Sequence, residues 1–307
     1  MQDRYYRFSK YLRERFSCRV KKISIDAGFS CPNRDGKLST GGCIYCDNRG
    51  FSMNSRVEPR PLQVQISDGI KGSKRSGKAE KFIIYFQAYT NTYAPTQILR
   101  QKYDTIKQFD DVVAIAIGTR PDCVNKEILE LINSYSDEYE VWIEYGLQSI
   151  HDKTLKIINR GHSFKDFLNA VSLTRLYPKI KICVHVIIGL PGETKEDMIM
   201  TARIIADLNM EGVKIHPLHV IKGTKLEEMF NNGSFKPLEI NEYINLVASF
   251  IENLAPSTVI QRISADCPPD LLIAPKWLHE KVKVLKSIDD YLEKSGIFQG
   301  KQYHPQS

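Results

Sequence analysis

The sequence has no long apolar run. Its longest purely apolar stretch covers residues 112–117, far short of the ~20 residues that a helix needs to cross a bilayer. The N-terminal segment MQDRYYRFSK contains no apolar signal core. We therefore expect a cytoplasmic protein with no membrane partner.

The sequence also has little that would support a disulfide framework. Its seven cysteines are an odd number spread over 307 residues without a secretory context, which favours reduced thiols that bind a metal or a cluster. Low-complexity linkers are absent as well. We expect one domain with two extensions: a basic, aromatic N-terminal segment (1–19), a central domain (20–264) and a C-terminal segment with a helix and a mobile tail (265–307).

Neither sign of charge dominates the composition. The formal net charge is +7, with 42% hydrophobic and 26% charged residues, which is typical of soluble globular proteins. This charge is compatible with a polyanionic partner and does not require one.

Short β-branched runs alternate with longer segments of helical periodicity. The alternation indicates an α/β fold in which parallel strands carry outer helices, as a partial or full (β/α) barrel. The expected strands cover 20–26, 81–86, 112–118, 141–146, 181–189, 212–220 and 257–263. In such a barrel, catalytic groups lie at the C-terminal ends of the strands.

Three cysteines follow the first expected strand. Cys31, Cys43 and Cys46 fall within sixteen residues of a glycine-rich loop, and thiolates favour zinc or iron–sulfur centres. A closed structural site normally has four such ligands, so three thiolates leave one coordination position open for catalysis. Spacing alone leaves two other readings: a zinc knuckle completed by Cys18 or a histidine, or a chance grouping of free thiols.

Several further motifs follow the cysteines in a fixed order. They read IGTRPD, EYGLQSIHDKTLKIINRGH and IIGLPGET. Together with the cysteine triad, they resemble the radical S-adenosylmethionine (SAM) superfamily from about Arg4 to Tyr291. Within it, the chain is similar to the YhcC/YtqA (MnmL) group, which is related to the radical SAM domain of the Elongator catalytic subunit.

The resemblance implies two cofactors. A [4Fe-4S] cluster on the three cysteines would bind S-adenosyl-L-methionine at its open iron and cleave it with one electron, so that a 5′-deoxyadenosyl radical takes hydrogen from the substrate. The electron would come from a donor such as flavodoxin or ferredoxin. No catalytic acid or base is assigned by the resemblance.

The resemblance also implies residues that bind SAM. Gln148 matches a polar residue that contacts the ribose, and Gly189 begins a segment that passes the adenine. Thr119 and Glu144 lie at strand ends that face the same pocket.

The remaining candidates for SAM binding are less direct. Arg160 and His185 are further candidates. Relatives often carry a glycine-rich turn after the second strand that binds the SAM amino group. This chain has QAYTNT at that place, where Gln87 or Asn91 could substitute.

Three further cysteines and two histidines are expected to have structural roles only. We expect Cys123, Cys183 and Cys267 to be ordinary thiols, and His216 and His219 to be structural histidines.

The N-terminal segment has two readings. Residues 4–22 carry eight Lys or Arg residues against one acidic residue, with aromatic residues interleaved. They could contact RNA, or they could form a solvated helix that packs its aromatic side chains on the barrel. A second basic stretch at 71–81 favours RNA.

The resemblance finally implies a substrate. The YtqA/MnmL group is associated with tRNA wobble uridine, where 5-carboxymethylaminomethyluridine becomes 5-aminomethyluridine before a methyltransferase acts. Two alternatives stay open: a radical SAM enzyme for a small molecule or a protein, and a non-enzymatic nucleic-acid-binding module that contains a metal or a cluster.

Overall fold

A curled, parallel sheet organises the chain. The computed structural model describes residues 3–77 and 79–304. Its main sheet has seven strands in the order β1-β2-β3-β4-β5-β6-β8, and every neighbouring pair is parallel. This confirms the α/β barrel, in its partial form. The strands are β1 (Val20–Ile25), β2 (Lys81–Phe86), β3 (Val112–Thr119), β4 (Glu140–Gln148), β5 (Ile180–Ile188), β6 (Gly212–Pro217) and β8 (Val259–Arg262).

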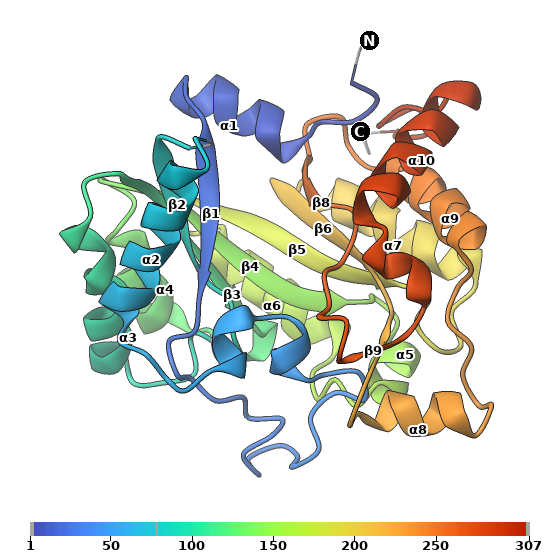
Figure 1. Cartoon of the computed structure of the whole chain (residues 1–307), viewed down its shortest axis with the longest axis horizontal. Helices are drawn as coiled ribbons and strands as arrows, with labels where there is room; N and C mark the ends of the chain where they lie inside the picture. Colours follow the sequence, from blue (N-terminus) through green and yellow to red (C-terminus); the bar gives the residue numbers. More distant parts are fainter. Residues whose placement is uncertain (1–2, 78, 305–307) are drawn as a thin grey trace.

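Helices cover the outer face of this sheet (Figure 1). They are α2 (Leu62–Arg75), α3 (Thr96–Tyr103), α4 (Lys126–Asn133), α6 (Phe164–Thr174), α7 (Lys195–Asp207), α9 (Ile240–Glu252) and α10 (Lys281–Lys294). The helices α5 (Asp152–Ile157) and α8 (Lys225–Asn231) instead pack with the cysteine loop, where Leu155 and Leu226 share an apolar cluster with Cys43. Capping boxes begin three of the covering helices, with Ser163 and Asp166 at α6, Thr194 and Asp197 at α7, and Glu239 and Glu242 at α9. These caps fix where each loop from a strand end turns back along the sheet.

Short elements complete the chain. A small antiparallel pair joins β7 (Val220–Ile221) to β9 (Leu272–Ala274). Five 3-10 turns cover Asn48–Gly50, Met53–Arg56, Asp104–Gln108, Pro121–Cys123 and Lys276–His279. No helix in the described part of the chain has both the length and the apolar character needed to span a membrane.

The two faces of the sheet have different chemistry because side chains alternate along a strand. On β4, Val141, Ile143 and Tyr145 point outward into the main hydrophobic core under the helices. Trp142 points to the inner face, where a second and smaller apolar cluster forms. Glu144, two residues further along, lines a cavity on that same face.

Helix α1 (Phe8–Phe16) lies across one end of the sheet (Figure 1). Leu12 is buried there, and the aromatic rings of Phe8, Tyr11 and Phe16 pack with it against inner-face residues. The rings of Tyr11 and Trp142 lie 5.7 Å apart. Of the two readings of the N-terminal segment, the packing of aromatic side chains on the barrel is the one that the structure shows.

The C-terminal segment is held to the N-terminal one. Gln299 accepts a hydrogen bond from the Tyr6 amide at 2.8 Å and donates to the carbonyl oxygens of Ala255 and Thr258. Gln302 donates its amide to Glu252. The sequence predicts a mobile tail here, whereas these contacts fix the segment as far as Gln302. Residues 305–307 of that predicted tail lie outside the described residues.

Candidate active site

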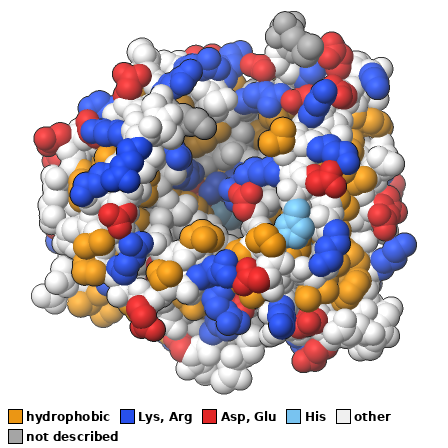
Figure 2. All heavy atoms as spheres, in the orientation of Figure 1, with side chains coloured by type: hydrophobic (Ala, Val, Ile, Leu, Met, Phe, Trp, Pro, Cys, Tyr) orange, Lys and Arg blue, Asp and Glu red, His pale blue; other side chains and the backbone are white. Residues whose placement is uncertain are grey.

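A cavity of about 570 Å³ runs from the strand ends into the barrel. Figure 2 shows it as a hollow with Lys and Arg side chains around it. Among the described residues, six basic side chains line the cavity (Lys22, Arg34, Arg120, Arg160, Lys214 and Arg262) and two acidic ones do (Glu144 and Asp266). The site is therefore suited to an anionic molecule.

Most of the residues predicted from the sequence meet in this cavity. Its lining includes Cys31, Cys43, Cys46, Gln87, Thr119, Glu144, Gln148, Arg160 and His185. Arg160 comes from the segment after α5, and the others come from a loop after β1 and from the ends or inner faces of β2, β3, β4 and β5, which explains why residues distant in sequence share one site.

Two predicted residues lie elsewhere. Asn91 is fully buried, and its Nδ2 donates to the carbonyl oxygens of Phe86 and Gly118 at 3.0 and 2.9 Å, so it links the ends of β2 and β3. Gly189 has a φ of +88°, and a Cβ there would lie 2.7 Å from a methyl carbon of Leu238. Neither residue is among those that line the cavity.

The cysteine loop is folded against the segment after α5. Asn159 donates from Nδ2 to the Gly42 carbonyl at 2.7 Å, and Asn33 donates to the Asn159 carbonyl at 2.7 Å. Gly161 has a φ of +73°, and a Cβ there would lie 2.7 Å from the Asn33 side-chain oxygen. Only glycine fits this close approach. The cysteine loop therefore packs against residues 159–162, which read NRGH.

Arg160 links the cysteine loop to the sheet. Its Nη1 lies 3.6 Å from the Sγ of Cys43, and its Nε and Nη2 donate to the carbonyl oxygen of Gly146 at 3.1 and 2.7 Å. Arg120 in turn donates to the Arg160 carbonyl at 2.8 Å. The guanidinium therefore places a positive charge beside a sulfur of the cysteine loop.

The thiols fit an iron–sulfur cluster better than a single ion. Among the described residues, no three His, Cys, Asp or Glu side chains converge on one metal position. A zinc ion needs such convergence, whereas each cysteine of a cubane binds a different iron. Cys18 is not among the residues that line the cavity with the other three cysteines, so nothing places it as a fourth ligand of a zinc knuckle.

Burial makes a thiolate costly at this loop. Burial, together with the neighbouring Cys43, raises the pKa of Cys46 to about 12. The positive charge of a bound iron centre reverses this preference, since metal-bound thiols are deprotonated. Cysteines in this setting are suited to act as ligands rather than as free nucleophiles.

Glu144 lies deeper in the cavity among basic side chains. Its Oε1 accepts from Lys22 Nζ at 2.8 Å, and its Oε2 accepts from His185 Nε2 at 2.8 Å and from Lys214 Nζ. Burial alone would raise the pKa of Glu144, but Lys214 and Lys22 outweigh burial and hold it well below its usual range. Burial lowers the pKa of Lys214 to about 8 and that of His185 to about 4.

Sequence reasoning missed Lys22 and Lys214. The available signal was a lysine at an inner-face position of an otherwise β-branched strand, in VKKISI and GVKIHP. Cys183, expected to be an ordinary thiol, is fully buried in the inner apolar cluster.

Comparison with known proteins decides the family. Residues 36–205 match the family model described as the radical SAM superfamily, and residues 210–294 match its C-terminal domain. The chain belongs to the radical SAM superfamily. It is an enzyme that uses a [4Fe-4S] cluster and SAM. The superfamily match begins after Cys31, so the assignment of that ligand rests on the cavity and on the motif.

Three known proteins are similar to this radical SAM enzyme in sequence or in structure. YtqA of Bacillus subtilis is 38% identical over 300 residues, which is 98% of this chain and 93% of YtqA. A tRNA uridine(34) acetyltransferase of Methanocaldococcus infernus is 34% identical over 190 residues, 60% of this chain and 34% of that protein. The structure of Elp3 from the same archaeon has a TM-score of 0.68 at 23% identity, covering 91% of this chain and 64% of Elp3, which supports the fold.

Proposed function

We propose that this radical SAM enzyme modifies the wobble uridine of tRNA and converts 5-carboxymethylaminomethyluridine to 5-aminomethyluridine. The observation that carries the proposal is the 34% identity over 190 residues to a protein named for acting on tRNA uridine 34. The excess of basic side chains around the cavity supports an RNA substrate.

The proposal gives the cavity residues these tasks. Cys31, Cys43 and Cys46 hold the cluster, which together with SAM supplies a carbon-centred radical that takes a hydrogen atom. Arg160 orders the cysteine loop. Gln87, Thr119 and Gln148, whose polar side chains line the cavity near the strand ends, bind SAM. Asn91 and Gly189, which do not line the cavity, are given no task in SAM binding.

The reaction balances without an added oxidant. The substrate methylene between nitrogen and carboxylate loses a hydrogen atom and then one electron, which replaces the electron used to cleave SAM. The resulting imine adds water, and the C–N bond breaks to give the amine and a two-carbon oxo acid. Water enters through the open cavity, which the structure connects to the surface (Figure 2).

The proposal includes a cellular setting. The enzyme acts in the cytoplasm on tRNA, receives its electron from a donor such as flavodoxin or ferredoxin, and delivers a product that a methyltransferase consumes.

Deuterium transfer tests the reaction. Anaerobic enzyme is incubated with SAM, a reductant and tRNA that carries deuterium at the methylene next to the carboxylate. We expect deuterium in 5′-deoxyadenosine and 5-aminomethyluridine in the tRNA digest. The control is tRNA with unmodified uridine at the wobble position. If both tRNAs give the same 5′-deoxyadenosine without deuterium, the enzyme acts on another substrate, such as a small molecule or a protein.

A further inference from the structure

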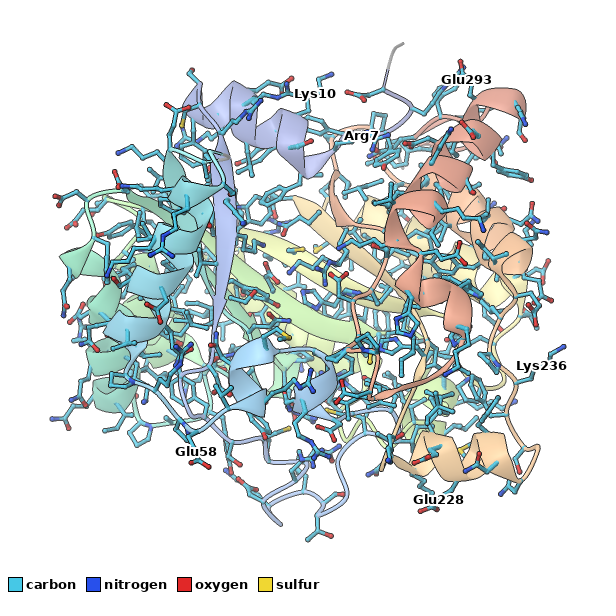
Figure 3. All side chains as sticks on the ribbon, in the orientation of Figure 1. Arg7, Lys10, Glu58, Glu228, Lys236 and Glu293 are labelled. Atoms are coloured by element: carbon cyan, nitrogen blue, oxygen red, sulfur yellow. The ribbon has the colours of Figure 1, made fainter. Side chains whose placement is uncertain are left out.

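The inner face of the barrel holds a basic cluster, which we define as Lys22, Glu144, Lys214 and Gln261. All four side chains line the cavity. Glu144 lies two residues before Gly146, the residue that Arg160 binds, so the basic cluster is ~7 Å deeper along β4 than that contact. Figure 3 draws the side chains on the ribbon in the orientation of Figure 1.

The carboxylate oxygens of Glu144 already accept hydrogen bonds from other side chains of the protein. Its carboxylate accepts from Lys22, Lys214 and His185, and it also interacts with the Tyr85 hydroxyl. A carboxylate has about four lone-pair sites, so little acceptor capacity is left for a ligand. Glu144 is therefore a positioning residue that holds the two lysines in place.

The basic cluster has a surplus of positive charge and of hydrogen-bond donors. Two ammonium groups face one carboxylate. The second acidic side chain of the cavity, Asp266, is bound by Arg262 and Lys281 at 2.8 and 2.7 Å. Gln261 accepts from Lys22 at 2.8 Å through Oε1, while its buried Nε2 has no partner. An unpaired donor beside an uncompensated charge is costly unless a ligand pairs with it.

The aromatic ring of Tyr85 lies beside both ammonium groups and does not neutralise their charge. The Nζ of Lys214 lies 4.1 Å from the Tyr85 ring centre, and the Nζ of Lys22 lies 4.9 Å from it. Contacts with an aromatic face stabilise a cation without neutralising it. A bound anion would supply the missing charge and accept from the unpaired amide of Gln261.

We propose that the basic cluster binds a carboxylate of the substrate. On the proposed function, on which this identification rests, the ligand is the carboxymethyl carboxylate of the modified uridine. Anchoring that group fixes the adjoining methylene, the carbon that loses hydrogen. The methionine carboxylate of SAM is the other source of the same chemistry, and the test separates the two.

Binding of a small probe tests the site without relying on RNA turnover. The reconstituted holoenzyme is titrated calorimetrically with N-methylglycine and with N-methylglycinamide, which keeps the amine and lacks the carboxylate, both in the presence of SAM. We expect the acid to bind about ten- to a hundredfold more tightly, the range of a charge-assisted hydrogen bond. Lys22→Met should remove that preference.

Matched variants separate a binding role from a folding defect. Lys181→Met removes another inner-face lysine, which pairs with Glu140 at 2.8 Å outside the cavity, and should keep the preference. Gln261→Glu places a built-in carboxylate beside Lys22, so it should raise the thermal midpoint and abolish binding of the acid. Equal affinity for acid and amide in the parent, or an unchanged preference in Lys22→Met and Gln261→Glu, would overturn the proposal.

The two sources of carboxylate give different kinetics. If the substrate is the source, Lys22→Met raises KM for tRNA with the carboxymethyl group about ten- to a hundredfold and leaves KM for SAM unchanged. A rise in KM for SAM alone would assign the cluster to SAM and overturn the proposal. Acid-selective binding without tRNA turnover would sink the proposed function alone, whereas turnover without acid selectivity would sink this inference alone.

Discussion

The guanidinium of Arg160 lies 3.6 Å from the Sγ of Cys43. The same side chain binds the carbonyl of Gly146 on β4, so one residue joins the cysteine loop to the inner face of the sheet. Partners of this kind orient metal ligands and tune them. The radical SAM site therefore depends on the segment after α5 as well as on the cysteines.

Replacing Arg160 with glutamine should weaken cluster binding. The loss of this contact leaves the Gly146 carbonyl and the Cys43 sulfur without their charged partner, and such changes typically lower metal affinity about 10–100-fold. Iron release to a chelator, followed by absorbance under anaerobic conditions, measures the effect. Arg34→Gln is the control, since the hydrogen bond of Arg34 to the loop goes to the backbone oxygen of Cys46 and not to a sulfur. Equal release from both variants would count against the role of Arg160.

Gly161→Ala should destabilise the support of the cysteine loop. Its positive φ and the 2.7 Å approach of a Cβ to Asn33 predict a loss of about 1–3 kcal/mol in the free energy of unfolding. Gly72→Ala, in helix α2 with nothing within 4 Å of its Cβ, should instead stabilise by about 0.5–1 kcal/mol. Thermal denaturation of both variants compares them. The account of the loop fails if the two midpoints move together.

Leu12→Ala should loosen helix α1 from the end of the barrel. Leu12 is 5% exposed, and truncation of a buried leucine costs about 2–5 kcal/mol. Leu176, which is 68% exposed, serves as the control, because its replacement by alanine should change stability by less than about 0.5 kcal/mol. Urea denaturation monitored by Trp fluorescence reports the change. A Leu12 variant as stable as the Leu176 variant would mean that α1 is not packed in solution.

Acidification should destabilise the apoprotein through buried histidines. Burial, together with the charges of Arg160 and Arg120, lowers the pKa of His162 to about 3. The unfolded chain takes up a proton below about pH 6.5 while the fold does not, so stability present above that pH is lost as pH falls toward 3, at about 1.4 kcal/mol per unit. His162→Gln should show a shallower fall between pH 7 and 5 in urea midpoints. His185, with a pKa of about 4, keeps part of the slope, and identical slopes in parent and variant would refute this role for His162.

The order of strands was predictable because each parallel strand reads as a β-branched run before a helix. The clustering of Gln87, Thr119 and Gln148 followed from it, since parallel strand ends share one edge. The presence of Cys43 and Arg160 in one site could also be predicted, because both belong to motifs that the resemblance to the radical SAM superfamily assigns to the cofactor site.

The basic cluster was not predictable from the sequence. Lys22 and Lys214 look like surface lysines in sequence, and only the curl of the sheet turns them inward onto Glu144. Asn91 is a candidate for SAM binding because it lies where relatives carry a glycine-rich turn for the SAM amino group, yet its amide is used by backbone carbonyls of two neighbouring strands. The N-terminal aromatic residues suited RNA by composition, and their packing on Trp142 depends on long-range contacts that no local pattern encodes.

The most direct test of the account is SAM cleavage by cysteine variants. The parent, Cys31→Ala, Cys43→Ala and Cys46→Ala are reconstituted anaerobically with iron and sulfide, reduced with SAM, and assayed for 5′-deoxyadenosine. Cys267→Ala is the control, because Cys267 lies outside the cavity lining. The account predicts cleavage by the parent and the Cys267 variant and none by the other three. Cleavage that survives loss of Cys43 would contradict it.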